Sequence, residues 1–266
     1  MKEKLKVLKM GGSVFADTHA LPAIYSLAKH ELETAGKLIV VVSAMGHTTD
    51  MLRKLMPEQT DSLRARDAML ATGEIVAASL TAAYFKGRGL KADCLNGQQA
   101  GIKTDAVFGD ANILDIDTSN INRFFETNDV AVVTGFQGAT ENGDITTLGA
   151  NGSDTTAFYL AHYFDAPTMI LYKDAMGIYD KNPKLDANAR RYKHVNFKDV
   201  LDGEIKGIIH HKALELCQKM FEKMPDRKII IRGTDMTQND YTTICRKDTE
   251  FYENSPLKPA RPEGAA

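Results

Sequence analysis

Residues 146–154, Thr-Thr-Leu-Gly-Ala-Asn-Gly-Ser-Asp, gather hydroxyl, amide and glycine residues immediately before a stretch with helical character. Glycines let the backbone approach a ligand closely, and the first amides of a helix together with its dipole favour an anion. The segment therefore suits a phosphate or another polyanion. The alternative is an ordinary helix start, in which Ser153 caps the helix and Asp154 is a first-turn acid. On this segment alone both interpretations stay open.

Three more turns rich in small and polar residues follow apolar runs, at residues 9–13, 43–49 and 135–138. In open α/β sheets, ligands bind at the carboxyl ends of the strands. Phosphoryl transfer needs backbone amides around the phosphates, a cation that offsets charge, and an acid that organises the positive groups. Candidates for these three parts are Gly11 with Gly12, Lys9 and Asp154. Neither the Gly-x-x-x-x-Gly-Lys-Ser/Thr loop nor the Gly-x-Gly-x-x-Gly fingerprint is present, so the common nucleotide folds are not indicated.

The elements that must position these residues alternate between strands and helices. Apolar β-branched runs, typical of strands buried on both faces, occur at residues 38–42, 130–133, 168–172 and 228–232. Helical spacing of apolar residues predicts helices at residues 22–32, 61–84 (interrupted at residues 72–74), 153–164 and 204–224, and Asn142-Gly143 predicts a hairpin. We therefore expect an α/β fold with a largely parallel sheet. A boundary near residue 165 is expected to divide an N-terminal lobe, 1–165, from a C-terminal lobe, 166–266.

Composition narrows the class of protein. The chain of 266 residues is 43% hydrophobic and 26% charged, which suits a globular protein with a sizeable core. Its net charge of −2 gives no case for nucleic-acid or membrane binding, and no apolar stretch of membrane-spanning length is expected. Three widely spaced cysteines predict reduced thiols in the cytoplasm. The adjacent His210 and His211 diverge by about 100° on a helix, so no metal site is predicted.

Seven segments, taken in order, resemble the motifs of the amino acid kinase family, and specifically of aspartate kinases. They are Val-Leu-Lys-Met-Gly-Gly-Ser (7–13), Val-Val-Ser-Ala-Met-Gly-His-Thr-Thr-Asp (41–50), Gly-Glu (73–74), Gln-Ala-Gly-Ile-Lys-Thr-Asp (99–105), Thr-Gly-Phe-Gln-Gly (134–138), residues 146–157 and residues 174–183. The resemblance covers residues 5–245, nearly the whole chain. It implies an αβα sandwich that transfers the γ-phosphoryl group of ATP, as MgATP, to a side-chain carboxylate. The N-terminal lobe would hold the acceptor and the C-terminal lobe the nucleotide.

The resemblance also implies roles for individual residues. Lys9 would neutralise charge on the transferring phosphoryl group, and Asp154 would orient Lys9. The residues expected to bind phosphate are Gly11, Gly12, Ser13 and Ser153. The residues expected to bind the amino acid are Thr49, Glu74, Gly135 and Phe136, with Glu74 facing the α-ammonium group. The residues expected to contact the nucleotide are Lys173, Asp174, Tyr179 and Lys184.

The sequence departs from the aspartate kinase pattern at Ala150, where the family commonly has an arginine that resembles a fork for the substrate α-carboxylate. A guanidinium binds a carboxylate through two hydrogen bonds, and its loss removes a few kcal/mol of recognition. Either another cation replaces it, or the acceptor lacks that free carboxylate. A second departure lies near Gly207, where the family has a nucleotide-contacting lysine; Lys206 or Lys173 are the candidate replacements. The paired regulatory domains of many aspartate kinases are not expected in this chain.

Three hypotheses for function follow. The first is ATP-dependent phosphorylation of the side-chain carboxylate of aspartate to 4-phospho-aspartate. The second is the same chemistry on an aspartate-related or derivatised acceptor, motivated by Ala150. The third is nucleotide or anion binding without turnover, against which the intact Lys9 and Asp154 argue. The resemblance further implies a homodimer, with the amino acid and MgATP as small-molecule partners.

Overall fold

The computed structural model describes residues 3–57, 62–183, 185–186, 188–205, 209, 211–234 and 241–252. Within these residues, nine strands form one sheet in the order β13-β10-β12-β11-β9-β1-β2-β6-β3. Their bounds are β1 Glu3–Met10, β2 Ala35–Val42, β3 Ala92–Leu95, β6 Val130–Thr134, β9 Thr168–Tyr172, β10 Tyr192–Asn196, β11 Lys228–Arg232, β12 Tyr241–Cys245 and β13 Glu250–Phe251. Neighbouring strands are parallel except β11 with β12 and β10 with β13. The sheet runs without a break through the region of residue 165, since β9 lies between β1 and β11.

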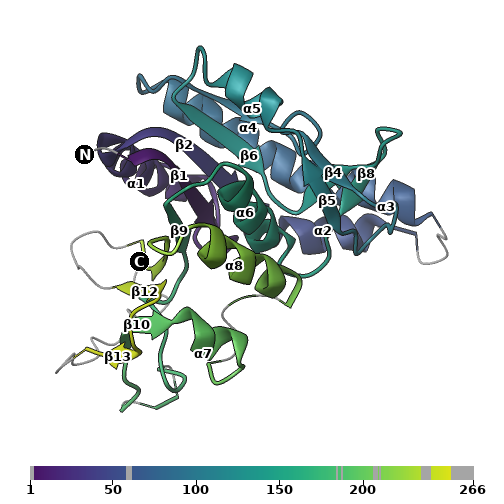
Figure 1. Cartoon of the computed structure of the whole chain (residues 1–266). Helices are drawn as coiled ribbons and strands as arrows, with labels where there is room; N and C mark the ends of the chain where they lie inside the picture. The colour runs from purple at the N-terminus through teal and green to yellow at the C-terminus, as the bar shows by residue number, and fades with distance from the viewer. Residues whose placement is uncertain are drawn as a thin grey trace, which may run out of the picture.

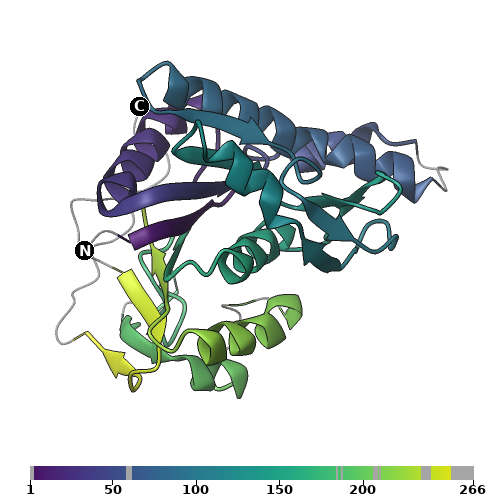
Figure 2. The ribbon, with the colours of Figure 1, turned by 45° about the horizontal axis from the view of Figure 1, so that its top comes forward.

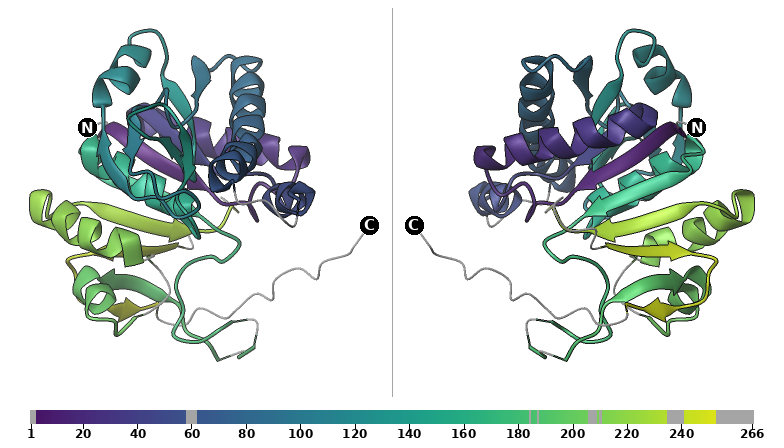
Figure 3. Two further views of the ribbon diagram at one scale, coloured as in Figure 1. Left: turned by 90° about the vertical axis from the view of Figure 1, so that its right-hand side faces the viewer. Right: turned by 90° about the vertical axis from the view of Figure 1, so that its left-hand side faces the viewer.

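Helices cover both faces of this sheet, so the expected αβα sandwich is confirmed (Figures 1 and 3). The helices are α1 Leu21–Thr34, α2 Thr48–Leu55, α3 Leu63–Leu70, α4 Thr72–Lys86, α5 Thr118–Phe124, α6 Gly152–Tyr163, α7 Phe197–Leu201 and α8 His211–Lys223, with a short 3-10 helix at Thr18–Ala20. Helices α1 and α4 pack on one face, and α6 and α8 on the other.

Alternation along the strands decides which face each side chain meets. In β1, Val7 joins the hydrophobic cluster under α6 and α8, whereas Leu8 joins the cluster under α1 and α4. Successive side chains of a strand point to opposite faces, so Lys9 shares the face of Val7 and Lys6 shares the face of Leu8. Lys6 accordingly binds Glu31 of α1, with 2.8 Å between Nζ and Oε2. One strand therefore delivers one lysine to each layer of helices.

Helices α3 and α4 follow each other along nearly one line, and a second, small sheet in the order β5-β4-β7-β8 lies beside the α3 end (Figure 2). Its strands are β4 Ile102–Thr104, β5 Ile113–Ile116, β7 Gln137–Ala139 and β8 Ile145–Thr147. The antiparallel β7–β8 pair confirms the predicted hairpin, with Gly143 at φ +83° in its turn. Helix α3 packs directly on β8, and this contact brings α3 to the edge of the large sheet where the polar turns meet.

Several elements differ from the sequence expectation. The segment after β2 is not only a polar turn, because α2 begins within it at Thr48. The helix expected over residues 204–224 is found as α8 from His211, and Glu204 instead lies in the bend after α7, where its amide bonds to Asp199. The strand at residues 228–232 is not the last, since β12 and β13 follow it. These C-terminal strands are short and half-polar, so no long apolar run marked them.

The long helical stretch Leu63–Lys86 meets, by length and composition, the criteria for a membrane span, which the sequence reading did not expect. Residues 72–74, where an interruption was predicted, belong to α4. Only Ala71 separates α3 from α4; its backbone stays in the helical region, and its amide donates a hydrogen bond to the carbonyl oxygen of Asp67. Half of the apolar window is buried within the fold, and α4 packs on β3 and β6. The hydrophobic residues thus serve the core of the domain.

Candidate active site

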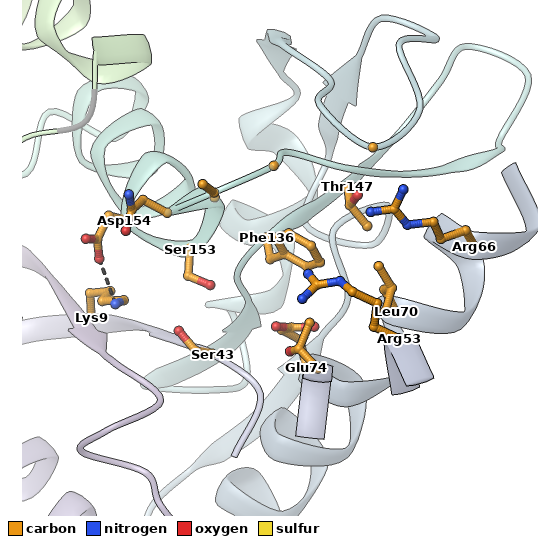
Figure 4. A pocket seen from close by; sticks show the side chains of 16 residues that line it. Lys9, Ser43, Arg53, Arg66, Leu70, Glu74, Phe136, Thr147, Ser153 and Asp154 are labelled. Carbon is orange, nitrogen blue, oxygen red and sulfur yellow. Dashed lines mark ion pairs between the residues drawn. The ribbon is translucent and has the colours of Figure 1, made fainter. Parts of the chain in front are cut away.

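A cavity of about 400 Å³ opens at the carboxyl ends of the central parallel strands (Figure 4). Met10, Val42 and Thr134 are partners in the register of β1, β2 and β6, so the turns after these strands emerge side by side. Helices α2, α3 and α4 bound the cavity on one side, and the start of α6 bounds it on the other. The fold therefore brings together turns that are more than one hundred residues apart in the sequence.

Lys9, Asp154 and Lys173 form a compact charged cluster at one end of this cavity. The Nζ atom of Lys9 lies 2.7 Å from Oδ1 of Asp154, and Nζ of Lys173 lies 3.4 Å from Oδ2. The side chains of Lys9 and Asp154 are about 10% exposed. Burial opposes ionisation of Asp154, but Lys9 and then Lys173 outweigh it and hold the pKa of that carboxyl below its usual value. The cluster carries two ammonium groups on one carboxylate and thus has positive charge to offer an anion.

The glycine turn after β1 lies against this cluster. A Cβ atom on Gly11 would stand 3.3 Å from Nζ of Lys9, and one on Gly12 would stand 3.2 Å from the carbonyl oxygen of Ala44. The missing side chains thus let the lysine lie along the backbone. Ser13 is exposed in the same turn. Gly11, Gly12 and Ser13 adjoin the charged cluster but do not line the cavity of 400 Å³.

Gly135, Phe136 and Ser153 join the end of β6 to the start of α6. A Cβ atom on Gly135 would come within 2.5 Å of the Cβ of Ser153, so only glycine permits this approach. Phe136 has a φ of +67°, an uncommon backbone conformation for an aromatic residue, and lines the cavity. Asn151, at φ +56°, occupies the N-cap position of α6, and its side chain makes no capping hydrogen bond. The alternative interpretation of Ser153 as the helix cap is therefore wrong, because Ser153 already lies inside the helix.

Glu74 and Thr49 line the middle of the cavity, together with Ser43 from the turn after β2. Glu74 is 3% exposed, and its Oε1 accepts a hydrogen bond of 3.1 Å from the amide of Ala44. Its Oε2 is buried and has no hydrogen-bond partner in the described part of the chain. Burial raises the pKa of Glu74 to about 7, although the backbone hydrogen bond lowers it in part. A buried carboxyl oxygen with no partner is suited to receive a donor from a ligand.

Two arginines that the sequence reading did not single out, Arg53 of α2 and Arg66 of α3, also line the cavity (Figure 4). Ala150 and its neighbours Gly149 and Asn151 line it as well. Arg53 and Arg66 are thus candidates for the cation that would replace the family arginine at Ala150, and both lie on the helices of the facing wall. Nothing in the sequence separates these arginines from nearby surface cations, because both helices are rich in charge.

Of the four residues expected to contact the nucleotide, the structure describes Lys173, Asp174 and Tyr179. Lys173 follows β9 and joins Asp154 in the charged cluster. Tyr179 is half-buried and pairs with Arg191 in an isolated β-bridge, and Asp174 is exposed just after β9. Lys184 lies outside the described residues, as do Lys206 and Gly207. No group of three or more metal-ligating side chains occurs in the part of the chain that the structure describes.

Comparisons with known proteins relate the chain to one family. The amino acid kinase family profile matches residues 4–229. The chain is 37% identical over 252 residues to an aspartokinase of Geobacillus stearothermophilus, covering 93% of this chain and 60% of that protein. It is also 37% identical to aspartokinase 2 of Bacillus subtilis, covering 94% and 60%. The fold matches Escherichia coli aspartokinase III in complex with aspartate and ADP, with a TM-score of 0.77 and 18% identity over 92% of this chain and 65% of that one.

The chain spans about 60% of the length of the curated relatives it matches. Within that span, the family profile covers far more than half of the 266 residues and includes both the charged cluster and the cavity. The chain therefore belongs to the amino acid kinase family.

Proposed function

We propose that the protein phosphorylates the side-chain carboxylate of aspartate with ATP and releases 4-phospho-aspartate and ADP. One observation supports this most directly: Lys9 and Asp154 of the charged cluster line the same cavity as Glu74, whose Oε2 has no hydrogen-bond partner among the described residues. The positive end of the cavity suits the phosphates of a nucleotide, and the Glu74 carboxyl suits the ammonium group of an amino acid acceptor. Relatives named aspartokinase, and the aspartate and ADP bound to the Escherichia coli neighbour, agree with this choice.

In this proposal the acceptor lies with its reacting carboxylate toward Lys9. A carboxylate oxygen forms the new bond to the γ-phosphorus while the bond from that phosphorus to the bridging oxygen of ADP breaks. The ammonium group of Lys9 offsets the charge on the equatorial oxygens, and Asp154 holds that ammonium in place. Glu74 accepts the α-ammonium group, and Thr49 and Phe136 shape the acceptor cavity with Gly135 behind them.

The nucleotide phosphates are proposed to lie between the glycine turn at Gly11, Gly12 and Ser13 and the first turn of α6 at Ser153. The amide groups of a helix start and the two lysines suit a polyphosphate. Asp174, Tyr179 and Lys184 are proposed to contact the rest of the nucleotide. Asp154 is occupied by two lysines, so Mg²⁺ is expected to enter bound to the phosphates, as is usual for this ion.

Ala150 is the reason for proposing a second class of acceptor as the alternative substrate. An aspartate-related or derivatised acceptor would fit a cavity in which the small Ala150 replaces a long side chain. ADP release measured with a panel of carboxylates decides between the two acceptors. Aspartate as the clear best substrate excludes the derivatised acceptor.

Trapping of the acyl phosphate with hydroxylamine tests the reaction itself. We expect hydroxamate from millimolar aspartate and MgATP, and its loss in Lys9→Ala. No hydroxamate above background from any carboxylate would contradict a kinase and favour binding without turnover. An unchanged rate in Lys9→Ala would show that Lys9 is not catalytic.

The lobe boundary near residue 165, a homodimer and a cytoplasmic location are proposed alongside this function. All residues that line the cavity fall within residues 9–154, which is in keeping with an acceptor lobe at 1–165. Analytical ultracentrifugation of the full chain checks the dimer.

A further inference from the structure

Arg66 is a cation in the cavity wall that has no counter-charge in the part of the chain that the structure describes. Its side chain is partly buried and lines the cavity with Gly149 and Ala150. Among the described residues its guanidinium has neither a hydrogen-bond nor an ion-pair partner. The other cations of the wall do have partners, since Lys9 pairs with Asp154 and Arg53 with Asp50 at 3.0 Å. Arg66 is thus the wall cation that is left to bind an anion from outside the chain.

The neighbouring Asp67 fixes the place of Arg66. Asp67 is fully buried, and its Oδ2 accepts hydrogen bonds from the amides of Thr147 at 2.7 Å and Gly109 at 2.8 Å. Its Oδ1 accepts a third bond from the hydroxyl of Thr147 at 2.9 Å. Thr147 and Gly109 belong to the cavity wall themselves. Helix α3 is therefore locked to that wall one residue away from Arg66, and Figure 4 shows Arg66 extending toward Thr147.

The charged side chains are arranged in a defined spatial order along the cavity. Figure 4 shows Lys9 and Asp154 at one end, Arg66 at the other, and between them Glu74 and Arg53, which is paired with Asp50. A positive group, an acceptor of hydrogen bonds and a second positive group complement a molecule that carries a carboxylate, an ammonium group and a second carboxylate. An amino dicarboxylate has this arrangement. A derivative with its second carboxylate masked would leave the Arg66 guanidinium desolvated and unpaired, which is costly.

We propose that Arg66 binds the α-carboxylate of the acceptor and thereby selects free amino dicarboxylates over their α-masked derivatives. The inference rests on the proposed carboxylate kinase function and names the residue that sets its specificity. Ala150 lines the cavity opposite α3, and its small side chain leaves space for the long Arg66 side chain and the carboxylate. The charge that the family pattern places at position 150 is thus supplied from α3.

The test compares L-aspartate with its α-amide, L-isoasparagine, which keeps the side-chain carboxylate and the α-ammonium group. For the unmodified enzyme we expect a KM for aspartate about 10- to 100-fold below that for the amide, the usual value of a charge-assisted pair of hydrogen bonds. Arg66→Leu should raise the KM for aspartate about 10- to 100-fold and that for the amide by less than about threefold, with a smaller effect on kcat. Arg66→Lys keeps the charge but loses the two parallel N–H donors of the guanidinium, so its KM for aspartate should lie between those of the unmodified enzyme and Arg66→Leu.

Arg64→Leu provides the matched control. Arg64 belongs to the same helix and pairs with Asp144, but it is exposed and does not line the cavity. Its removal should leave the preference for aspartate intact. Ala150→Arg in the Arg66→Leu background offers a guanidinium from the facing wall of the same cavity and should restore part of the preference. Melting temperatures of all variants show whether the fold is kept.

The outcomes separate this inference from the proposed function. If hydroxamate forms from aspartate but Arg66→Leu shifts both KM values equally or not at all, the role of Arg66 is overturned while the kinase stands. If Arg53→Leu abolishes the preference and Arg66→Leu does not, the assignment to Arg66 is overturned. If no carboxylate yields hydroxamate, the kinase fails. Calorimetric titration of aspartate into unmodified and Arg66→Leu protein then still reports whether Arg66 binds the carboxylate.

Discussion

At the scale of single residues, the two carboxyl groups of the site differ in their electrostatic surroundings. Asp154 faces two lysines, and its pKa lies below the usual value despite burial. Glu74 is buried to a similar degree, but its contact is a backbone amide and no cation, so its pKa rises to about 7. Asp154 is thus charged at neutral pH, whereas Glu74 changes its charge near neutral pH. This difference suits a fixed organiser and a group that waits for a cationic ligand.

The titration of Glu74 predicts a pH dependence of acceptor binding. Below pH 7 the carboxyl is protonated and binds the α-ammonium group poorly; above pH 7 the carboxylate binds it well. We expect kcat/KM for aspartate to rise about tenfold between pH 6 and pH 8, and to become flat in Glu74→Gln. The ligand-free protein should behave in the opposite way: because the folded pKa lies above the unfolded value, stability from Glu74 is full below about pH 4.5 and is lost as the pH rises through 7. An equal pH slope of kcat/KM in the Gln variant contradicts the assignment.

Asp154→Asn keeps the shape of the side chain and removes its charge. Lys9 and Lys173 would then repel each other without a counter-charge, and Lys9 would leave the reacting position. We expect kcat to fall about 10²- to 10⁴-fold, with a smaller change in the KM for aspartate, because the acceptor contacts lie elsewhere in the cavity. Initial rates of ADP release measure this split. A kcat within a factor of about three of the unmodified value would show that Asp154 does not organise the transfer.

At the scale of elements, the strands that carry the site were predictable. The apolar β-branched run of β9 was expected at its observed bounds, and the parallel strands end together, so the turns after β1, β2 and β6 had to meet. The arginines of the opposite wall were not predictable, because they depend on how α2 and α3 pack. The position of Arg66 follows from the buried Asp67 and its bonds to β8, which are long-range contacts without a sequence pattern.

The contact between β6 and α6 predicts the effect of Gly135→Ala. The added methyl group would collide with Ser153 at 2.5 Å and push α6, which carries Asp154, away from β6. We expect a loss of stability of about 1–3 kcal/mol and a larger relative loss of kcat, measured by denaturant unfolding and hydroxamate formation. Gly233→Ala is the control, since its Cβ meets Met176 at an ordinary 3.5 Å. Equal effects of the two substitutions would contradict the role of close packing at Gly135.

At the scale of the whole molecule, α8 is tied to the loop that closes the acceptor cavity. The Nζ atom of Lys212 donates to the carbonyl oxygen of Asp110 at 3.0 Å and lies 2.5 Å from Oδ1 of the same residue. It also reaches the carbonyl oxygens of Ala111 and Leu148, at 3.3 and 3.5 Å. Gly109, next to this anchor, lines the cavity. A residue from the C-terminal part of the chain thus supports a wall built by the N-terminal part.

Lys212→Met should therefore loosen the wall without touching the acceptor. Bonds to a charged group contribute about 1.5–3 kcal/mol, so we expect faster amide hydrogen exchange in residues 107–111 and a several-fold higher KM for aspartate. Lys219→Met changes an exposed lysine of the same helix and should have neither effect. Unchanged exchange in residues 107–111 of the Lys212 variant would contradict the anchoring role.

Strand β1 places Lys6 and Lys9 on opposite faces of the sheet, so stability and turnover should respond to different substitutions. Lys6 binds Glu31 and Thr34 on the α1 side, and Lys9 binds Asp154 on the α6 side, three positions along the same strand. Loss of Lys6 would leave the buried Glu31 carboxylate without its cation, which costs about 3–5 kcal/mol of stability. Loss of Lys9 would remove the cation that is proposed to offset charge on the transferring phosphoryl group. Because the sheet separates the two networks, their free-energy changes should add in a double-mutant cycle. Under the proposed function, substitutions on one side of this strand should change the stability of the protein, and substitutions on the other side should change its turnover.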